Sequence, residues 1–227
     1  MLGLVIASSA FAGEKTLLRY NLKENERFEF QAKMNISGEK LGHLNGIFHI
    51  AERVTSVKPT DIQLSMFIAG ASASGDGVFQ SATSQLDQMR NKSYAKAIRV
   101  NGQQLANPDA RQQFNSPIDL IYADQPVEVG DTWTAEQDPN STADKRAISY
   151  KLVALTDSEA TIEASADIKM QFKTVGPYVF VVDRASGKPK KVSGSLQAGA
   201  AETTLDIKFE MTMIAHTMMN EPKTGGQ

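Results

Sequence analysis

The sequence of 227 residues contains no cysteine, and this absence excludes several kinds of chemistry. Thiol catalysis, disulfide bonds, thiolate metal sites and a lipidated cysteine at a cleavage point all need this residue. A chain of this length buries about 70% of the surface that its unfolded form exposes, so it can build a core without covalent support. We therefore expect stability to come from packing alone.

An excess of charge and long apolar runs are missing as well. The formal net charge is -2, and residues of both signs are interspersed along the chain. Nucleic-acid-binding domains carry a basic patch and membrane-surface segments a polybasic run, so the sequence favours neither class. After the first residues, no apolar run approaches the ~20 residues that a helix needs to cross a bilayer. We expect no nucleic-acid partner and no transmembrane span.

The beginning of the chain has the pattern of an export signal. Residues 2–7 form a short apolar run, and Ala10-Phe11-Ala12 then provides the small-x-small pattern that a signal peptidase reads. Cleavage before Gly13 would make residues 1–12 the remnant of a signal peptide and the mature protein periplasmic or secreted. The alternative is that this segment is an apolar first strand or a buried helix.

Alternation of apolar and polar residues with a period of two dominates the rest of the chain. Such alternation places one set of side chains in a core and the other in water, as in antiparallel strands with one solvated face. We expect nine to eleven strands in a mainly β (α+β) fold, a large curved antiparallel sheet that forms a sandwich or an open barrel. The clearest runs are residues 28–36, 62–68, 162–172 and 205–213.

Turn-forming residues separate these runs, and short connections of this kind join neighbouring antiparallel strands. Residues 69–76 are rich in Gly, Ala and Ser and predict a flexible loop or a strand edge, whereas residues 79–97 fit a helix and a polar strand pair equally well. The predicted turns are residues 45–46, 58–61, 129–131, 156–158 and 185–188.

Two short helices are expected near the middle of the chain. Asn107 can cap a helix over residues 107–114, and Pro108 suits its first turn. The same start signal recurs and predicts a second helix over residues 116–122. The expected organisation is a signal-peptide remnant (1–12), an N-terminal β-rich half (13–105), a helical connection (106–125), a C-terminal β-rich half (126–217) and a disordered tail (218–227).

Three stretches resemble a group of exported bacterial proteins that is catalogued only as a domain of unknown function. Residues 18–28 are similar to the group's opening, in which two aromatic strands flank a turn, and Asn25 stands where the group usually has glycine. Asparagine also tolerates a left-handed turn. Residues 126–133 resemble the central segment, and residues 181–188 fit a later hairpin. The resemblance implies location and fold, and it carries over no catalytic residue.

The histidines do not have the spacing of a metal site. His43 and His49 are six residues apart, and His216 ends the last run. Metal ligands on one strand face would be two residues apart, and those on a helix three or four. Ser186 lies in a turn and not in a Gly-x-Ser-x-Gly motif. We predict no catalytic residue, no metal, no cofactor and no enzymatic activity.

Carboxylates at a sheet rim leave a hydrolase as the weakest alternative, because pairs such as Asp183 with Glu202 or Asp206 could converge in the fold. Trp133, directly after the turn at 129–131, is interpreted as a buried anchor of its strand. The alternative makes it a platform on which a sugar or another ligand stacks.

The apolar face of the second half contains small residues, Ala160, Ala164 and Ala166, that leave depth above the sheet. A packed core fills that depth with protein, whereas a hollow would hold a lipid-like molecule. The leading hypothesis is an exported, non-catalytic binding or interaction module of the bacterial cell envelope, with an envelope protein or a hydrophobic small molecule as partner. The alternative is a carrier of a hydrophobic ligand, with contacts from Ile148, Tyr150, Leu152, Ile162, Ile168, Met170, Ile207, Phe209 and Met211.

Overall fold

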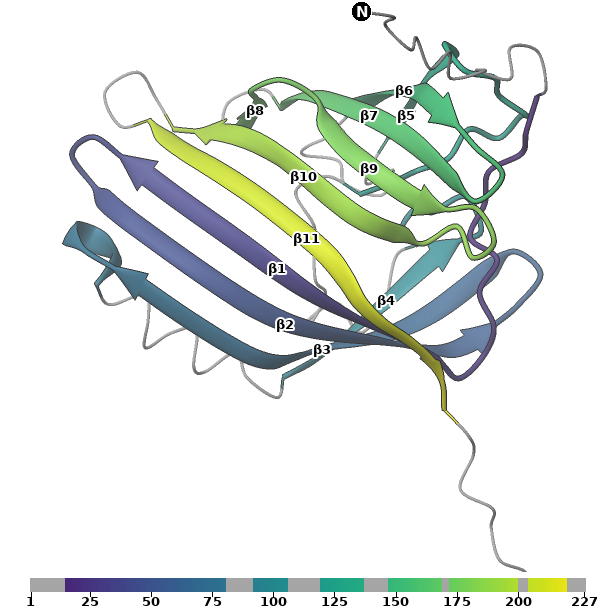
Figure 1. The fold of residues 1–227 in the computed structure, drawn as a ribbon, viewed down its shortest axis with the longest axis horizontal. Coiled ribbons are helices and arrows are strands. Elements are labelled where there is room, and N and C mark those ends of the chain that lie inside the picture. The colour runs from purple at the N-terminus through teal and green to yellow at the C-terminus, as the bar shows by residue number, and fades with distance from the viewer. Residues whose placement is uncertain are drawn as a thin grey trace, which may run out of the picture.

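The computed structural model describes residues 15–80, 92–105, 119–136, 147–168, 172–199 and 204–219, and its strands join in one antiparallel sheet (Figure 1). The helical part of these residues is one short 3-10 turn, η1 (Gly77–Phe79). No helix among them has the length and apolar character that crossing a bilayer requires. The eleven strands are β1 (Glu26–Gly38), β2 (Gly42–Val57), β3 (Asp61–Gly75), β4 (Ser93–Arg99), β5 (Thr132–Glu136), β6 (Ala147–Leu155), β7 (Glu159–Ile168), β8 (Phe172–Thr174), β9 (Tyr178–Asp183), β10 (Pro189–Ala198) and β11 (Leu205–Met218).

The order of the strands places the first strand, β1, beside the last strand, β11, in the middle of the sheet. It reads β4-β3-β2-β1-β11-β10-β8-β7-β6-β5, and β9 pairs with both β10 and β7. The first half therefore runs outward to the edge strand β4, and the second half begins at the other edge, β5, and returns. The first and last strands pair along most of their length, from Glu26 opposite Met218 to Ser37 opposite Asp206. We call this β1–β11 pairing the seam.

The strand pattern predicted from the sequence is confirmed, and so are four of the five turns. Residues 58–61, 129–131, 156–158 and 185–188 lie where strands end or begin. Asn25, just before β1, has a φ of 68°, which is the left-handed conformation expected for the residue that replaces glycine. The predicted run over residues 162–172 is divided between β7 and β8.

The turn predicted at Asn45-Gly46 is wrong, because both residues lie inside β2 and the hairpin turn falls at residues 39–41. Gly46 is opposite Met34 of β1, and a Cβ atom on it would lie 2.9 Å from the ring of Phe48. This glycine therefore makes room for an aromatic ring on the same strand instead of forming a turn.

The Gly- and Ala-rich segment predicted as a loop or a strand edge is the end of β3. Ala71 and Ala73 pair with Phe48 and Gly46 of β2. On its other side, β3 pairs with β4 only as far as Phe67, so among the described strands the rest of β3 is an edge. Of the ambiguous residues 79–97, residues 93–97 belong to β4.

The predicted helical connection is wrong where the structure describes it. Residues 119–125 contain no helix, and Leu120, Ile121 and Tyr122 are all buried. The carbonyl of Asp119 accepts a hydrogen bond from Tyr150 Oη at 2.5 Å, and that of Ile121 accepts one from Trp133 Nε1 at 2.8 Å. An irregular chain that buries consecutive side chains satisfies its backbone through such side-chain donors. The helix predicted at 107–114 lies outside the described residues.

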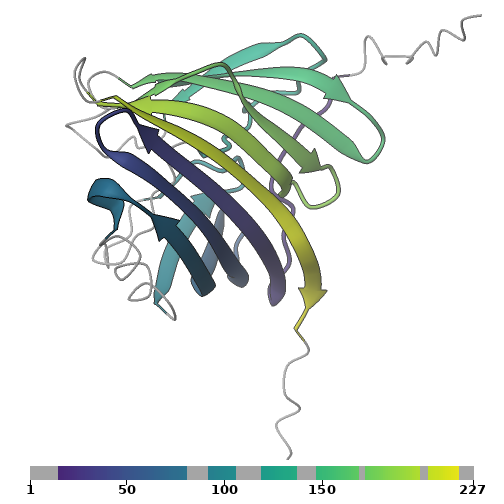
Figure 2. The same cartoon turned by 60° about the vertical axis from the view of Figure 1, so that its left-hand side comes forward.

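Among the described residues, irregular segments and not a second sheet cover part of the inner face of the sheet. Residues 15–22 and 119–127 lie against it, joined to each other where Thr16 and Val127 exchange backbone hydrogen bonds of 2.8 and 2.9 Å. Figure 2 shows how strongly the sheet is bent. The expected sandwich or open barrel is not confirmed: the described strands form a single sheet that ends at β4 and β5.

Both ends of the sequence extend beyond the described residues. The predicted signal-peptide remnant, residues 1–12, lies outside them, and so do residues 220–227 of the predicted tail. The first two residues of that tail are ordered: Met218 closes β11, and the amide of Met219 donates a 3.0 Å hydrogen bond to the carbonyl of Asn25.

Candidate functional site

The inner face of the second half is a packed core. Ile148, Leu152 and Ile162 have no exposed surface, and Tyr150 is 1% exposed. They form one cluster with buried residues of the covering segments, including Leu18 and Tyr122. The protein's own chain therefore buries four of the nine predicted ligand contacts: Ile148, Tyr150, Leu152 and Ile162. Three others, Ile207, Phe209 and Met211, pack against the same cluster but are only half-buried.

The inner face at the seam is less completely covered. On β11 every second side chain from Leu205 to Met213 points to the inner face and is half-buried, while the alternating polar residues are exposed. Met34 and Ile36 of β1 and Phe48 of β2 are half-buried too, whereas their inner-face neighbours Ala32 and Leu44 are buried. We call this region the seam surface and define it as Met34, Ile36, Phe48, Leu205, Ile207, Phe209 and Met211.

Strand register places these side chains in rows across the sheet. Ile36 is opposite Ile207, and Met34 is opposite Phe209. The row through Met34 and Phe209 ends in a glycine on each side, Gly46 of β2 and Gly194 of β10. Directly opposed side chains in a sheet lie close enough to touch. The side chains of the seam surface therefore form one continuous apolar surface over β1, β2 and β11.

Three of the predicted ligand contacts, Ile207, Phe209 and Met211, belong to the seam surface. Of the other two, Ile168 is the last residue of β7, and Met170 lies outside the described residues. The seam-surface residues of β1 and β2 are absent from the predicted set. Their alternation was visible in the sequence, but nothing in it indicated that the first strand pairs with the last.

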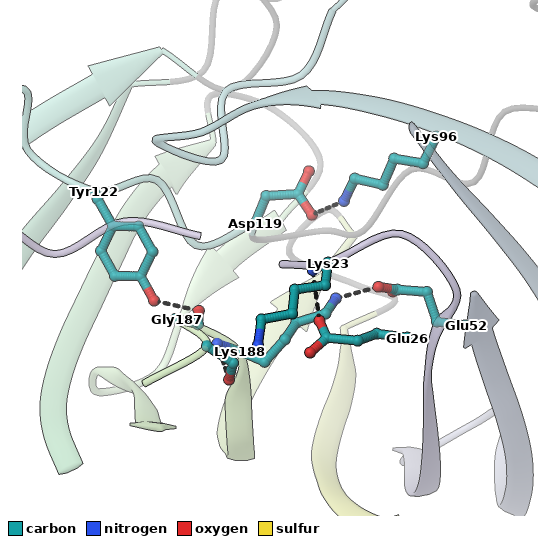
Figure 3. Close-up of polar contacts among 9 residues, drawn as sticks. Lys23, Glu26, Glu52, Lys96, Asp119, Tyr122, Gly187 and Lys188 are labelled. Atoms are coloured by element: carbon teal, nitrogen blue, oxygen red, sulfur yellow. Dashed lines mark hydrogen bonds and ion pairs between the residues drawn. The ribbon is translucent and has the colours of Figure 1, made fainter. Parts of the chain in front are cut away.

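Two buried charges connect the halves of the sheet. Lys188, just before β10, forms an ion pair with Glu52 of β2, and their side chains are only 7% and 13% exposed (Figure 3). The Lys188 ammonium also lies 5.4 Å from the ring centroid of Phe28 and 5.7 Å from that of Tyr20. Cation–π contacts of this kind are strongest where water is excluded. Because β1 and β11 lie between β2 and β10, the ion pair spans the seam.

A second ion pair fixes one covering segment to the sheet. Lys96 of β4 contacts Asp119 at 2.8 Å. Burial alone lowers the pKa of Lys96, but the adjacent Asp119 carboxylate outweighs this effect, so the pKa is raised. The Lys96 ammonium is thus retained at neutral pH. The segment before β5 is held at its start by charge and further along by the hydrogen bond from Trp133.

Buried tyrosines complete the polar contacts under the sheet. The hydroxyl of Tyr122 donates to the carbonyl of Gly187 at 2.6 Å (Figure 3). Desolvation raises the pKa of Tyr20, Tyr122 and Tyr150 well above the usual value for a phenol.

Gly187 has a φ of 69°, and a Cβ atom there would collide with the carbonyl of Arg19. Glycine is thus required for the turn to approach the covering segment this closely.

The histidines lie apart. His43 and His49 are exposed on β2, whereas His216 stacks on Phe28 with ring centroids 4.4 Å apart. His216 Nε2 lies 3.4 Å from a carboxylate oxygen of the buried Glu26. Within the described part of the chain, no three His, Asp or Glu side chains are grouped so that they could hold a metal ion.

The carboxylate pair proposed for a hydrolase does not form between Asp183 and Asp206. Asp183 accepts hydrogen bonds from Ser186 in the turn before β10, and Asp206 accepts one from Gln197 near the other end of β10. The two ends are roughly 30 Å apart, because each residue advances a strand by about 3.3 Å. Glu202 lies outside the described residues.

Trp133 is half-buried and anchors the edge of the sheet. Its ring stacks on Tyr150, with centroids 5.4 Å apart and an interplanar angle of 13°, and its Nε1 donates to Ile121. These contacts support its interpretation as an anchor of the strand. Trp133 also lines a groove, which is described below.

The fold and the site define a class of protein: a single open, bent antiparallel sheet whose inner face is filled by irregular segments in one region and left half-covered in another. Residues 68–179 match a family of unknown function, DUF6263. The resemblance to a domain of unknown function is thereby confirmed. The match includes the central segment 126–133, whereas the opening 18–28 and the hairpin 181–188 lie beyond it.

A solved structure titled "Lipid-protein interactions in lipovitellin" is similar in fold. It superposes with a TM-score of 0.52 at 6% sequence identity, and the alignment covers 89% of this chain and 26% of that chain. The chain thus spans about a quarter of the length of the lipovitellin chain, and at this identity the likeness concerns the fold alone. No curated protein matches the sequence.

Proposed function

We propose that this chain is an exported, non-catalytic binding module of the cell envelope and that its seam surface binds a hydrophobic, lipid-like molecule. The observation that carries the proposal is the contrast within one sheet. Apolar side chains on β6 and β7 are fully buried by the chain's own segments, but those of the seam surface are half-buried. A continuous apolar surface of this kind is stabilised when a ligand covers it.

The chemistry of the seam surface fits a hydrocarbon chain. Its seven residues carry no charge, and Lys188 and Glu52, which span the seam, form an ion pair with each other. Methionine and phenylalanine side chains adapt to irregular apolar shapes. Each buried methylene contributes about 0.8 kcal/mol, so a long acyl chain lying along β11 would bind without a charged anchor.

Two further observations support the proposal. The lipovitellin structure that shares the fold carries a title about lipid–protein interactions. Residues 2–12 have the pattern of an export signal, and the opening strands resemble exported bacterial proteins. An exported carrier would bring such a molecule through the aqueous space of the envelope.

The test is binding of a fluorescent fatty acid, cis-parinaric acid, to the full chain, together with native mass spectrometry of protein purified from its host. Phe209→Glu places a charge in the seam surface and should weaken binding at least tenfold. Thr212→Glu is the matched control, because Thr212 is exposed on the outer face of the same strand. It should bind as the wild type does. Absence of binding by the wild type, or equal binding by both variants, would contradict the proposal.

A further inference from the structure

A groove runs along the free edge of β5, the strand that ends the sheet. Among the described strands β5 pairs only with β6. The groove has a volume of about 640 Å³ and is lined by residues 131–136 on one side and by residues 121–127 on the other. Lys15, Asn101 and Gln103 complete its wall.

The lining shows which part of the strand faces the groove. Successive side chains of a strand point to opposite faces, so a pocket on one face would be lined by alternate residues. Here six consecutive residues of the chain, 131–136, line the groove. The groove therefore follows the backbone edge of β5.

Hydrogen bonding to β6 identifies the backbone groups that point outward. The carbonyl of Asp131 accepts a 3.0 Å hydrogen bond from the amide of Leu152, so Asp131 is a hydrogen-bonded position of the ladder. Such positions alternate along an antiparallel strand, so Trp133 bonds β6 in the same way. The amides and carbonyls of Thr132 and Thr134 then point to the free edge, and both side chains are exposed.

Charge indicates what would fit there. Among the described residues of the walls, Asp124 and Asp131 carry carboxylates and Lys15 carries an ammonium, so negative charge is in excess. A groove with this balance attracts a basic ligand. A free strand edge supplies alternating donors and acceptors at the spacing of an extended peptide, and such peptides bind by adding a strand to a sheet.

We propose that this groove binds an extended, basic peptide segment of a partner protein, which pairs with Thr132 and Thr134 as an additional strand beside β5. The proposal is independent of the ligand proposed for the seam surface. The seam lies in the middle of the sheet, and β6, β7, β8, β9 and β10 separate β5 from it.

The experiment is selection of a random octapeptide phage library on the immobilised full chain and on two variants. Thr134→Pro removes the outward amide but leaves the ladder with β6 intact, because proline is tolerated at an edge position whose N–H faces outward. Thr134→Val keeps the amide and is the matched control. The wild type and Thr134→Val should enrich peptides with Lys or Arg at alternate positions, and Thr134→Pro should bind these peptides at least tenfold more weakly.

Two measurements keep the test decisive. Hydrogen exchange should show protection of the Thr132 and Thr134 amides when a selected peptide is bound. Alternate amides of the bound peptide face β5 and the others face away. N-methylation of the amides that face β5 should abolish binding, and N-methylation of the other set should not. This measurement uses the wild-type chain, so it holds even if Thr134→Pro fails to fold. The proposal would be overturned if no peptide is enriched, or if the enriched peptides are acidic or are aromatic mimics of saccharides. It would also be overturned if neither set of N-methylated peptides loses binding.

Discussion

Two regions of one sheet share the same alternation of residues but differ in how far they are covered. On β6 and β7 the inner side chains are fully buried, because residues 15–22 and 119–127 lie over them. At the seam the inner side chains of β11 are only half-buried. The alternation thus determines which side chains face inward, whereas the path of the irregular segments determines which of them are available to a ligand.

The largest effect is expected where the two regions are joined. Lys188→Met leaves Glu52 buried without its partner and should lower the free energy of unfolding by about 3–5 kcal/mol. The double variant Lys188→Met with Glu52→Leu removes both charges and should recover most of this loss. Urea denaturation measures both. A double variant as unstable as the single one would show that the ion pair itself, and not the orphaned carboxylate, governs stability here.

Matched truncations measure the difference in cover directly. Ile162→Ala removes a side chain with no exposed surface and should cost about 3 kcal/mol, because a cavity remains in a packed core. Ile207→Ala removes a half-buried side chain of the seam surface and should cost about 1 kcal/mol, because less apolar area is lost from the core. Equal losses in denaturation experiments would mean that the seam surface is packed as tightly as the second half.

High pH should weaken the covered region. Burial raises the pKa of Tyr20, Tyr122 and Tyr150, and it raises the pKa of Tyr178 to about 12. The stabilising contribution is complete below the phenol's ordinary pKa of about 10. Above it the unfolded chain releases protons that the folded chain keeps, so stability falls by about 1.4 kcal/mol per pH unit for each such group.

Phenolate absorbance followed together with circular dichroism checks this expectation. Ionisation of the buried tyrosines should coincide with loss of the fold, because their hydroxyls are sequestered under the sheet. Tyrosines that all ionise near pH 10 in a folded chain would contradict the burial described for them.

The smallest effect is expected at the end of a covering segment. Trp133→Phe keeps an aromatic ring against Tyr150 but removes the hydrogen bond to the carbonyl of Ile121. The free energy of unfolding should fall by about 1 kcal/mol, the usual net contribution of such a bond. Thermal denaturation measures it, with Thr134→Val as a surface control on the same strand. An unchanged stability would indicate that packing alone holds the segment.

Much of the sheet could be predicted because strand patterning is local. Residues 205–213 alternate in the sequence and in β11, and Asn25 adopts the left-handed turn expected from its place between two strands. The error at Asn45-Gly46 has a non-local cause. Gly46 lies against the Phe48 ring, where a side chain would not fit. A glycine that makes room for a ring and a glycine that forms a turn look the same to turn propensity.

The covering segments were harder to predict. Pro117 and the polar residues around it match the start of a helix, yet residues 119–122 are irregular, because Tyr150 and Trp133 satisfy their carbonyls from strands far along the chain. Only the β11 part of the seam surface was predicted. Its β11 residues were identified, but Met34 and Phe48 became part of the site through a pairing between the first and last strands that no local pattern encodes.

The seam also has a consequence for how the chain reaches its native state. β1 ends at Gly38, whereas its partner β11 begins only at Leu205. Contacts of such long sequence separation form slowly, because the intervening chain must be ordered before they are gained. Until residues 205–218 arrive, the edges of β1 and β10 are unpaired, and unpaired edges invite aggregation. We expect folding to be slow and completed only when the last strand inserts between β1 and β10.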